Sequence, residues 1–317
     1  MQPTPADDDF HRPTTDDPWW NETAWFTMMV PDRNLYCYVY PWVRANQGLL
    51  GGGVMVWDDR GRYPWEAVHW DYHWTYPYPE LGDLRDVTFP TGITMQCLEP
   101  LQRYRVAYEH PTCSLDVTFE GLLPPHGLGG DDDTTGTFAG HLDQQGRVRG
   151  RLVVDGEEHA IDCFGIRDRS WGRRVPTPGM HIGYDIATGA DTAFIAFSYP
   201  ESPGEPLVPG FGYLWCDGQQ APLATGTRTI QRDGTWPRSV TVRGEDERGR
   251  PLRADGECVN WMAFQNLPSM VNLVSLVRWE VARPEGAPDV VWGEMEDVWD
   301  VDRFRRFARA TDPAGRM

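Results

Sequence analysis

The sequence lacks several features that would assign it to a common class of protein. It has no CxxC pair of cysteines, no basic stripe and no long apolar run. A membrane-spanning helix needs about 18–20 apolar residues, so we expect no membrane insertion. The opening residues MQPTPADDDFHRPTTDD have neither the basic region nor the apolar core of a signal peptide. We therefore expect a cytoplasmic protein whose six dispersed cysteines are free thiols.

Basic charge is also scarce. The chain has 47 Asp and Glu against 29 Lys and Arg, a formal net charge of −18. Binding to nucleic acid needs clustered cations, so we expect no nucleic-acid partner. The GxSxG, GxGxxG, HExxH and Walker patterns are all absent. Their absence argues against common hydrolases, dehydrogenases and nucleotide-dependent enzymes. The oligomeric state stays open.

Short apolar runs between turn residues predict the fold class. Runs rich in β-branched and aromatic residues alternate with Gly, Pro, Asp and Asn, and the chain has 33 Gly and 27 Pro. This pattern is typical of all-β sandwiches and barrels and disfavours long helices. One short helix is expected near the C-terminus, over residues 301–310. Residues 1–18 are rich in Asp, Thr and Pro and predict a disordered acidic tail.

Two segments place aromatic residues on every second position. Because side chains alternate across a strand, each segment predicts one aromatic face. Such faces either fill a core or line a ligand cavity inside a barrel. The alternate face of the second segment carries His69, Asp71 and His73. Four residues along a strand separate His69 and His73 by roughly 13 Å, so we expect no metal site there. The candidate ligand-binding residues from these segments are Tyr38, Trp70, Tyr72, Trp74, His69 and His73.

The segment 141–174 carries the most specific motif. An Asp-Gly pair at 155–156 predicts a tight β-hairpin, which runs into GIRDRSWGRR (165–174). The Asp168, Ser170, Trp171 and Gly172 positions resemble the tandem lipocalin-like family that includes carotenoid 1,2-hydratase (hydroxyneurosporene synthase). His141, the segment 18–22 and the segment 292–299 fit the same resemblance.

The resemblance implies two tandem lipocalin/calycin-like antiparallel barrels packed together. The domains would span residues 19–174 and 175–317, with an apolar ligand between or within them. It implies no metal and no organic cofactor. Asp168 would be the acid that protonates a C=C bond, and Trp171 would line the ligand site. Arg169 stands where the hydratases more often have His, so the substrate stays open.

The residues around Asp168 leave two interpretations open. Arg167 and Arg169 flank it, with Arg173 and Arg174 close by, and nearby cations would lower its pKa and favour a structural ion pair. Burial against Trp171 would raise its pKa and make it a proton donor near neutral pH. A second candidate catalytic residue is His181, which would shuttle protons or orient substrate beside Tyr184 in a Gly-rich stretch.

The sequence thus supports three hypotheses. The first is a cofactor-independent acid/base enzyme, a hydratase, dehydratase, isomerase or cyclase acting on an isoprenoid, steroid or aromatic compound. The second is a carrier that binds a hydrophobic ligand and performs no chemistry. The third is a scaffold whose aromatic stripes only pack. Glu22, Glu294 and Glu296 are alternative acids in the first hypothesis.

Overall fold

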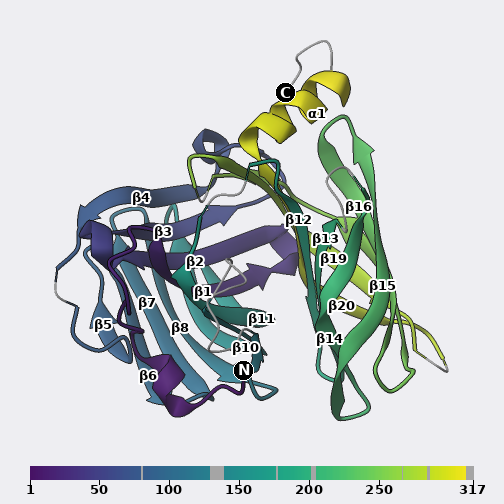
Figure 1. The fold of residues 1–317 in the computed structure, drawn as a ribbon, viewed down its shortest axis with the longest axis horizontal. Helices are drawn as coiled ribbons and strands as arrows, with labels where there is room; N and C mark the ends of the chain where they lie inside the picture. The colour runs from purple at the N-terminus through teal and green to yellow at the C-terminus, as the bar shows by residue number, and fades with distance from the viewer. Residues whose placement is uncertain are drawn as a thin grey trace. The chain divides into compact units, whose positions relative to one another are not determined.

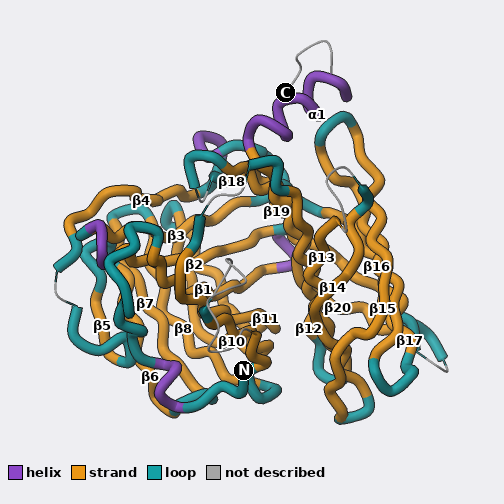
Figure 2. The backbone as a smooth tube through the Cα atoms, viewed as in Figure 1, coloured by secondary structure: helices purple, strands orange, loops and turns teal. Residues whose placement is uncertain are grey.

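The computed structural model describes residues 1–79, 81–128, 139–175, 178–200, 205–265, 267–283 and 286–311. Strands dominate these residues (Figure 2), and the predicted all-β class, tandem lipocalin-like architecture and short C-terminal helix are confirmed. The chain forms two compact units. Unit 1 is Met1–Trp57 with Ala67–Val175, and unit 2 is Asp58–Glu66 with Pro176–Met317. Within the described residues, no helix is both long and apolar enough to cross a membrane.

Unit 1 is built on one curled antiparallel sheet (Figure 1), in the order β4-β3-β2-β1-β11-β10-β8-β7-β6-β5, with β9 paired to β10. Its strands are β1 (Trp20–Val30), β2 (Leu35–Arg44), β3 (Leu49–Trp57), β4 (His69–Pro77), β5 (Asp86–Thr88), β6 (Ile93–Glu99), β7 (Arg103–His110), β8 (Cys113–Gly121), β9 (His126–Leu128), β10 (Gly140–Val154) and β11 (Glu157–Arg173).

The curl of this sheet defines an inner and an outer face. Phe26 on β1 contacts Tyr104 on β7 and Phe119 on β8, with ring centroids 6.2 and 5.9 Å apart. Strands β11 and β10 stand between β1 and β8, so these rings meet across the inside of the curl. Phe26 therefore marks the inner face, and its neighbour Trp25 marks the outer face. The sheet stays a half-barrel, since β4 and β5 end it without pairing to each other.

Unit 2 is a closed barrel, because β17 pairs with both β16 and β19. Its core is aliphatic around Trp279 and Phe194. The strands are β12 (His181–Thr188), β13 (Thr192–Pro200), β14 (Leu207–Cys216), β15 (Gln219–Asp233), β16 (Trp236–Asp246), β17 (Pro251–Cys258), β18 (Met262–Phe264), β19 (Met270–Val281) and β20 (Asp289–Asp300). The helix α1 (Val301–Thr311) follows β20, and Phe307 of α1 stacks on Trp299 with centroids 4.8 Å apart.

The first 18 residues differ from the predicted disordered tail. They include a 3-10 helix, η1 (Pro5–Asp8), and the side chain of Asp8 is buried. The low hydrophobicity of the segment favoured disorder. Its docking instead uses ion pairs and hydrogen bonds to arginines about 160 positions later, which no local pattern reveals.

Candidate active site

Strand alternation along β11 separates the motif residues onto two faces. Arg167 and Arg169 point to the inner face, where Arg167 binds Asp8 and Gln144 and Arg169 binds Glu22. Asp168 lies opposite Trp25 of β1 and therefore points to the outer face. The two flanking arginines thus bind other side chains. Asp168 therefore does not form the ion pair with Arg167 or Arg169 that their proximity in sequence suggested.

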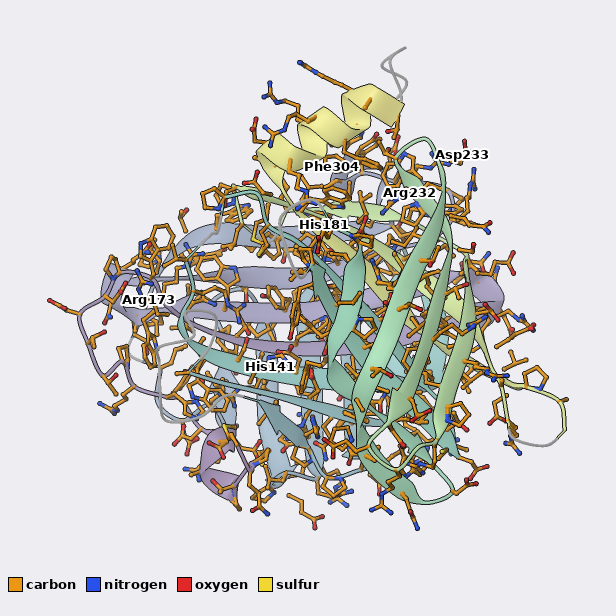
Figure 3. All side chains as sticks on the ribbon, turned by 45° about the vertical axis from the view of Figure 1, so that its right-hand side comes forward. His141, Arg173, His181, Arg232, Asp233 and Phe304 are labelled. Atoms are coloured by element: carbon orange, nitrogen blue, oxygen red, sulfur yellow. The ribbon has the colours of Figure 1, made fainter. Side chains whose placement is uncertain are left out.

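An acid cluster of Asp168, His141 and Asp143 lies on the outer face. The β10–β11 register pairs Asp143 with Asp168. His141 Nε2 is 3.0 Å from Asp143 Oδ2, and His141 Nδ1 is 3.6 Å from Asp168 Oδ2. The Asp143 side chain is fully buried, and that of Asp168 is 13% exposed. The acid cluster is therefore almost dry, with Asp168 its most accessible member (Figure 3 labels His141).

Hydroxyl groups and a cation border the acid cluster. Ser170, two residues beyond Asp168, has its Oγ 2.8 Å from the Oγ1 of Thr23. The guanidinium of Arg174 donates to the same Ser170 oxygen. Residues 168 and 170 are alternate positions of β11, so alternation places both on the outer face. The hydrogen bond to Ser170 brings Arg174 to the same side. The site therefore holds acidic, basic and hydroxyl groups within one patch of sheet.

Burial and mutual charge set the protonation of the acid cluster. Burial raises the pKa of Asp168 to about 6, against the lowering effect of the His141 charge. Burial alone would lower the pKa of His141, but the carboxylates of Asp143 and Asp168 raise it to about 9. At neutral pH His141 is thus an imidazolium, and roughly a tenth of Asp168 carries a proton. A carboxyl of this pKa can donate and recover a proton under physiological conditions.

The two aromatic stripes lie on the same outer face as the acid cluster. Trp25, opposite Asp168, contacts Tyr38 edge to face with ring centroids 5.1 Å apart. Trp42 donates a hydrogen bond from Nε1 to the Tyr72 hydroxyl at 3.2 Å. Tyr72 in turn contacts Trp74 at 5.4 Å. The predicted aromatic face is therefore present, with Tyr38 buried.

The position of these rings differs from the cavity interpretation that the sequence left open beside core packing. That interpretation places the stripes inside a barrel, whereas they stand on the outside of the curled sheet of unit 1. Trp70 pairs with Met55 on this face. Between the rings, the inner face carries aliphatic residues such as Val39 and Val54, which are fully buried. Alternation predicts that the rings share a face, but it does not say which face is concave.

His69 and His73 form a separate hydrogen-bonded chain on the inner face. His69 Nε2 lies 3.2 Å from the Tyr108 hydroxyl, which donates to Asp71 Oδ2 at 2.5 Å. His73 Nε2 is 2.6 Å from the other oxygen of Asp71. Because Tyr108 is on β7, this chain joins β4 to the far side of the curl. Both histidines therefore lie on the opposite face of the sheet from Asp168.

Trp171 also turns away from Asp168. As an odd-numbered residue of β11 it points to the inner face, where its ring stacks on His11 with centroids 3.6 Å apart and planes 3° apart. His11 Nδ1 is held 3.1 Å from Glu22. The burial that raises the pKa of Asp168 therefore does not come from packing against Trp171, as the sequence suggested. Glu22, one of the alternative acids, is occupied by Arg169 and His11.

His181 and Tyr184 belong to unit 2 and to opposite faces of β12. His181 Nε2 is 2.9 Å from Asp297, and its ring stacks on Trp299 (Figure 3 labels His181 beside Arg232 and Phe304). Burial lowers the pKa of His181. Tyr184 contacts Phe197 at 5.5 Å. His181 therefore serves a second buried cluster, in a different unit from the acid cluster.

The acid cluster is the set of described residues whose donor atoms would suit a metal ion, since they lie within 4.8 Å of one another. Its charge state opposes that use. The raised pKa of His141 means that its imidazole must lose a proton before it can bind a cation. The positive charge of Arg174 also acts on Asp168 and His141. The arrangement therefore suits proton transfer better than metal binding.

Arg174 is one of the cations that the sequence placed near Asp168, whereas Asp143, Thr23 and Trp25 were missed, although one signal pointed to Asp143. The turn at Asp155–Gly156 sets the hairpin register, and the pairing continues without a bulge from Val154–Glu157 to Gly140–Trp171. Counting back from the turn places Asp143 opposite Asp168 and His141 opposite Ser170.

Comparisons with known proteins agree with this architecture. The profile of the family described as "Domain of unknown function (DUF7064)" matches residues 4–298. None of the curated proteins compared with the chain is a significant match.

Several solved structures are similar in fold. An AttH protein from Nitrosomonas europaea has a TM-score of 0.53 and 13% identity over 88% of this chain and 91% of its own. CghA with Sch210972 has a TM-score of 0.57 and 12% identity, covering 89% of each chain. Kievitone hydratase from Nectria haematococca has a TM-score of 0.50 and 11% identity, covering 88% of each. At these identities the similarity shows a common fold, and function must be argued from the site.

Proposed function

We propose that this chain, which belongs to the family described as "Domain of unknown function (DUF7064)", is an enzyme that protonates a hydrophobic small molecule. The observation that carries the proposal is the buried carboxyl of Asp168, whose pKa is raised to about 6, on an aromatic sheet face. The substrate class is an isoprenoid, a steroid or an aromatic compound. The reaction needs no redox change, so the side chains of the acid cluster suffice for it.

In the proposed reaction Asp168 donates its proton to a carbon of a C=C bond or to the oxygen of a C–O bond. In the first case the π electron pair forms the new C–H bond and leaves a carbocation on the neighbouring carbon. Addition of water, loss of a neighbouring proton or attack by a second C=C then gives hydration, isomerisation or cyclisation. In the second case the C–O bond breaks and water leaves with the donated proton, again leaving a carbocation. The neighbouring carbon then loses a proton, its C–H electron pair forms the C=C bond, and the Asp168 carboxylate takes up the proton, which completes dehydration.

The neighbours of Asp168 have defined roles in this scheme. The His141 imidazolium stabilises the carboxylate that remains after proton transfer, and Asp143 orients His141 through their 3.0 Å contact. The rings of Trp25 and Tyr38 face the same side as Asp168. A carbocation next to such a ring gains about 0.5–2 kcal/mol per ring by cation–π attraction. Among proteins of this fold, kievitone hydratase is described as a hydratase, which is compatible with the proposal.

The test is Asp168→Asn, which keeps the shape of the side chain and removes its acidity. Asp162→Asn is the matched control, because Asp162 is on the same strand with a side chain 54% exposed, in a surface ion pair with Arg147. Each variant is incubated in D2O with a panel of alkenes and tertiary alcohols of the three substrate classes, and products are identified by mass spectrometry. Binding is followed by Trp fluorescence.

We expect Asp168→Asn to lower turnover by about 10²–10⁴-fold while affinity changes little. Asp162→Asn should behave as the unchanged protein. Turnover that survives Asp168→Asn would contradict the proposal. A compound that binds all three proteins and is recovered chemically intact would identify a carrier instead. Loss of folding in Asp168→Asn alone would make the residue structural.

A further inference from the structure

The first twelve residues occupy the inner face of the curled sheet of unit 1. We call residues 4–12 the plug. In Figure 1 this dark purple segment runs beside β6. Asp8 is its anchor: the carboxylate accepts hydrogen bonds from the Tyr104 hydroxyl at 2.8 Å, the Leu101 N–H at 2.7 Å and Arg167 Nη1 at 3.2 Å. Asp8 is also the single fully buried residue among residues 1–19.

Arg169 binds the plug through its backbone. Its Nη1 donates to the carbonyl of Asp7 at 3.1 Å, and its Nη2 donates to the carbonyl of Asp9 at 3.0 Å. The two buried guanidinium groups of Arg167 and Arg169 are thus covered by three oxygen-bearing groups of the plug. Pro5 and Ala6 are exposed, and the ring contact of the plug comes from His11, which stacks on Trp171 with centroids 3.6 Å apart.

Two of the guanidinium nitrogens remain without a hydrogen-bond partner in the described residues, namely Arg167 Nη2 and Arg169 Nε, although both are buried. Both arginines line a cavity with room for about one water molecule. The cavity wall also includes Phe26, Leu84 and Met95. A buried donor without a partner carries a free-energy cost, so this surface offers more hydrogen-bonding capacity than the plug uses.

Charge balance shows what would replace the plug. Arg169 keeps Glu22, which lies on β1 and stays with the sheet. Arg167 has Asp8 as its carboxylate partner, and without the plug it is a buried cation with no counter-ion. An uncompensated buried charge costs several kcal/mol. A carboxylate ligand would remove that cost, and the apolar wall would accept a hydrocarbon chain.

We propose that the inner face of unit 1 is a binding site for a long-chain carboxylate, and that the plug occupies it as an internal ligand. The ligand carboxylate takes the place of Asp8 on Arg167 and Tyr104, and its chain lies against Phe26 and Met95. Residues 13–19 connect the plug to β1 and are mostly exposed. Asn46 and Gln47 hold the carbonyls of Thr15, Asp17 and Pro18, so the plug would withdraw about this anchored connection. This site faces away from the acid cluster and does not depend on the proposed reaction.

The experiment compares full chains carrying Asp8→Ala or Asp16→Ala with the unchanged protein. Asp16 lies in the exposed connection, so its replacement makes the same change in net charge without touching the site. Laurate is titrated against each protein by isothermal calorimetry. Dodecanol tests whether the carboxylate is needed, and acetate tests whether the chain is needed.

We expect Asp8→Ala to bind laurate about tenfold or more tightly than the unchanged protein, and Asp16→Ala to match the unchanged protein. Asp8→Ala should prefer laurate to dodecanol and acetate, and adding Arg167→Gln should remove the preference over dodecanol. Equal laurate binding by all three proteins would overturn the proposal. If Asp8→Ala is partly unfolded, laurate but not dodecanol should restore its circular dichroism, and failure to do so would also overturn it.

Discussion

Arg174 and Arg173 are adjacent arginines, and we expect only Arg174 to affect the pKa of Asp168. Arg174 lies on the outer face, and its charge lowers the pKa of Asp168. Arg173 binds Asp17 at 2.6 Å and points to the other face. Arg174→Gln should therefore raise the pKa of Asp168 from about 6, by up to about one unit, while Arg173→Gln leaves it unchanged.

Carboxyl ¹³C NMR of Asp-labelled protein measures this difference directly, and the signal lost in Asp168→Asn identifies the residue. No substrate is needed. Equal titration midpoints in the two arginine variants would show that the charge of Arg174 does not reach Asp168.

At the residue scale, the motif singled out Asp168, the proposed acid, but not its surroundings. Proximity in sequence suggested that the nearby arginines lower its pKa, and the charges of Arg174 and Arg169 do so. In an extended strand the residues on either side point to the other face, so the residues opposite Asp168 come from β10 and β1. Trp171 was expected beside the ligand because it belongs to the motif, and His181 because it stands in a Gly-rich stretch beside Tyr184. Neither lies with Asp168 in the acid cluster.

At the scale of elements, the most informative local signal was the turn at 155–156. Asp155 and Gly156 both adopt positive φ, 50° and 80°, as a tight two-residue hairpin requires. That turn determines the register of a long hairpin and thereby the pairing of Asp143 with Asp168. The concave side of the sheet was not predictable, because it depends on contacts such as Phe26 with Tyr104, which are far apart in sequence.

Helix α1 gives a prediction for a whole element. Ala308 is buried, whereas Ala310, two residues later, is exposed. A Glu at 308 would place a charge where α1 packs on the barrel of unit 2, close to the Phe307–Trp299 stack. Ala308→Glu should lower the free energy of unfolding by about 2–4 kcal/mol, and Ala310→Glu by less than about 0.5 kcal/mol.

Urea unfolding followed by Trp fluorescence measures both values. Equal stability of the two variants would mean that α1 contributes little to the barrel.

At the scale of the whole molecule, composition predicted the all-β class because strand-forming runs and turn residues recur throughout the chain. Composition did not predict the placement of two segments that depart from the expected domain bounds. Residues 58–66 belong to unit 2, where Tyr63 contacts Trp236 edge to face at 5.7 Å. The plug returns to β11 through Asp8 and Arg167. Both placements depend on contacts between residues far apart in sequence, which leave no periodic pattern.

The pH dependence of global stability follows from the charge of His141. Its pKa is about 9 in the fold, against an ordinary value of 6.5, so the folded state binds its proton more tightly than the unfolded chain. The stabilisation is complete below pH 6.5 and is lost as the pH rises through 9. The thiol of Cys163, whose pKa burial raises to about 11, adds a loss in the same direction once unfolded thiols ionise, above about pH 8.5.

The contribution of His141 is therefore isolated by comparing the unchanged protein with His141→Gln between pH 7 and 8.5. In this window the histidines with lowered pKa, His69, His126 and His181, are mostly neutral in both states and contribute little slope. We expect the free energy of unfolding to fall more steeply with pH in the unchanged protein than in His141→Gln, as measured by urea unfolding at each pH. A smaller slope remains in the variant, because removal of the His141 charge raises the pKa of Asp168. Parallel slopes would mean that His141 is not held as an imidazolium, and the acid cluster would then lack the cation that stabilises ionised Asp168.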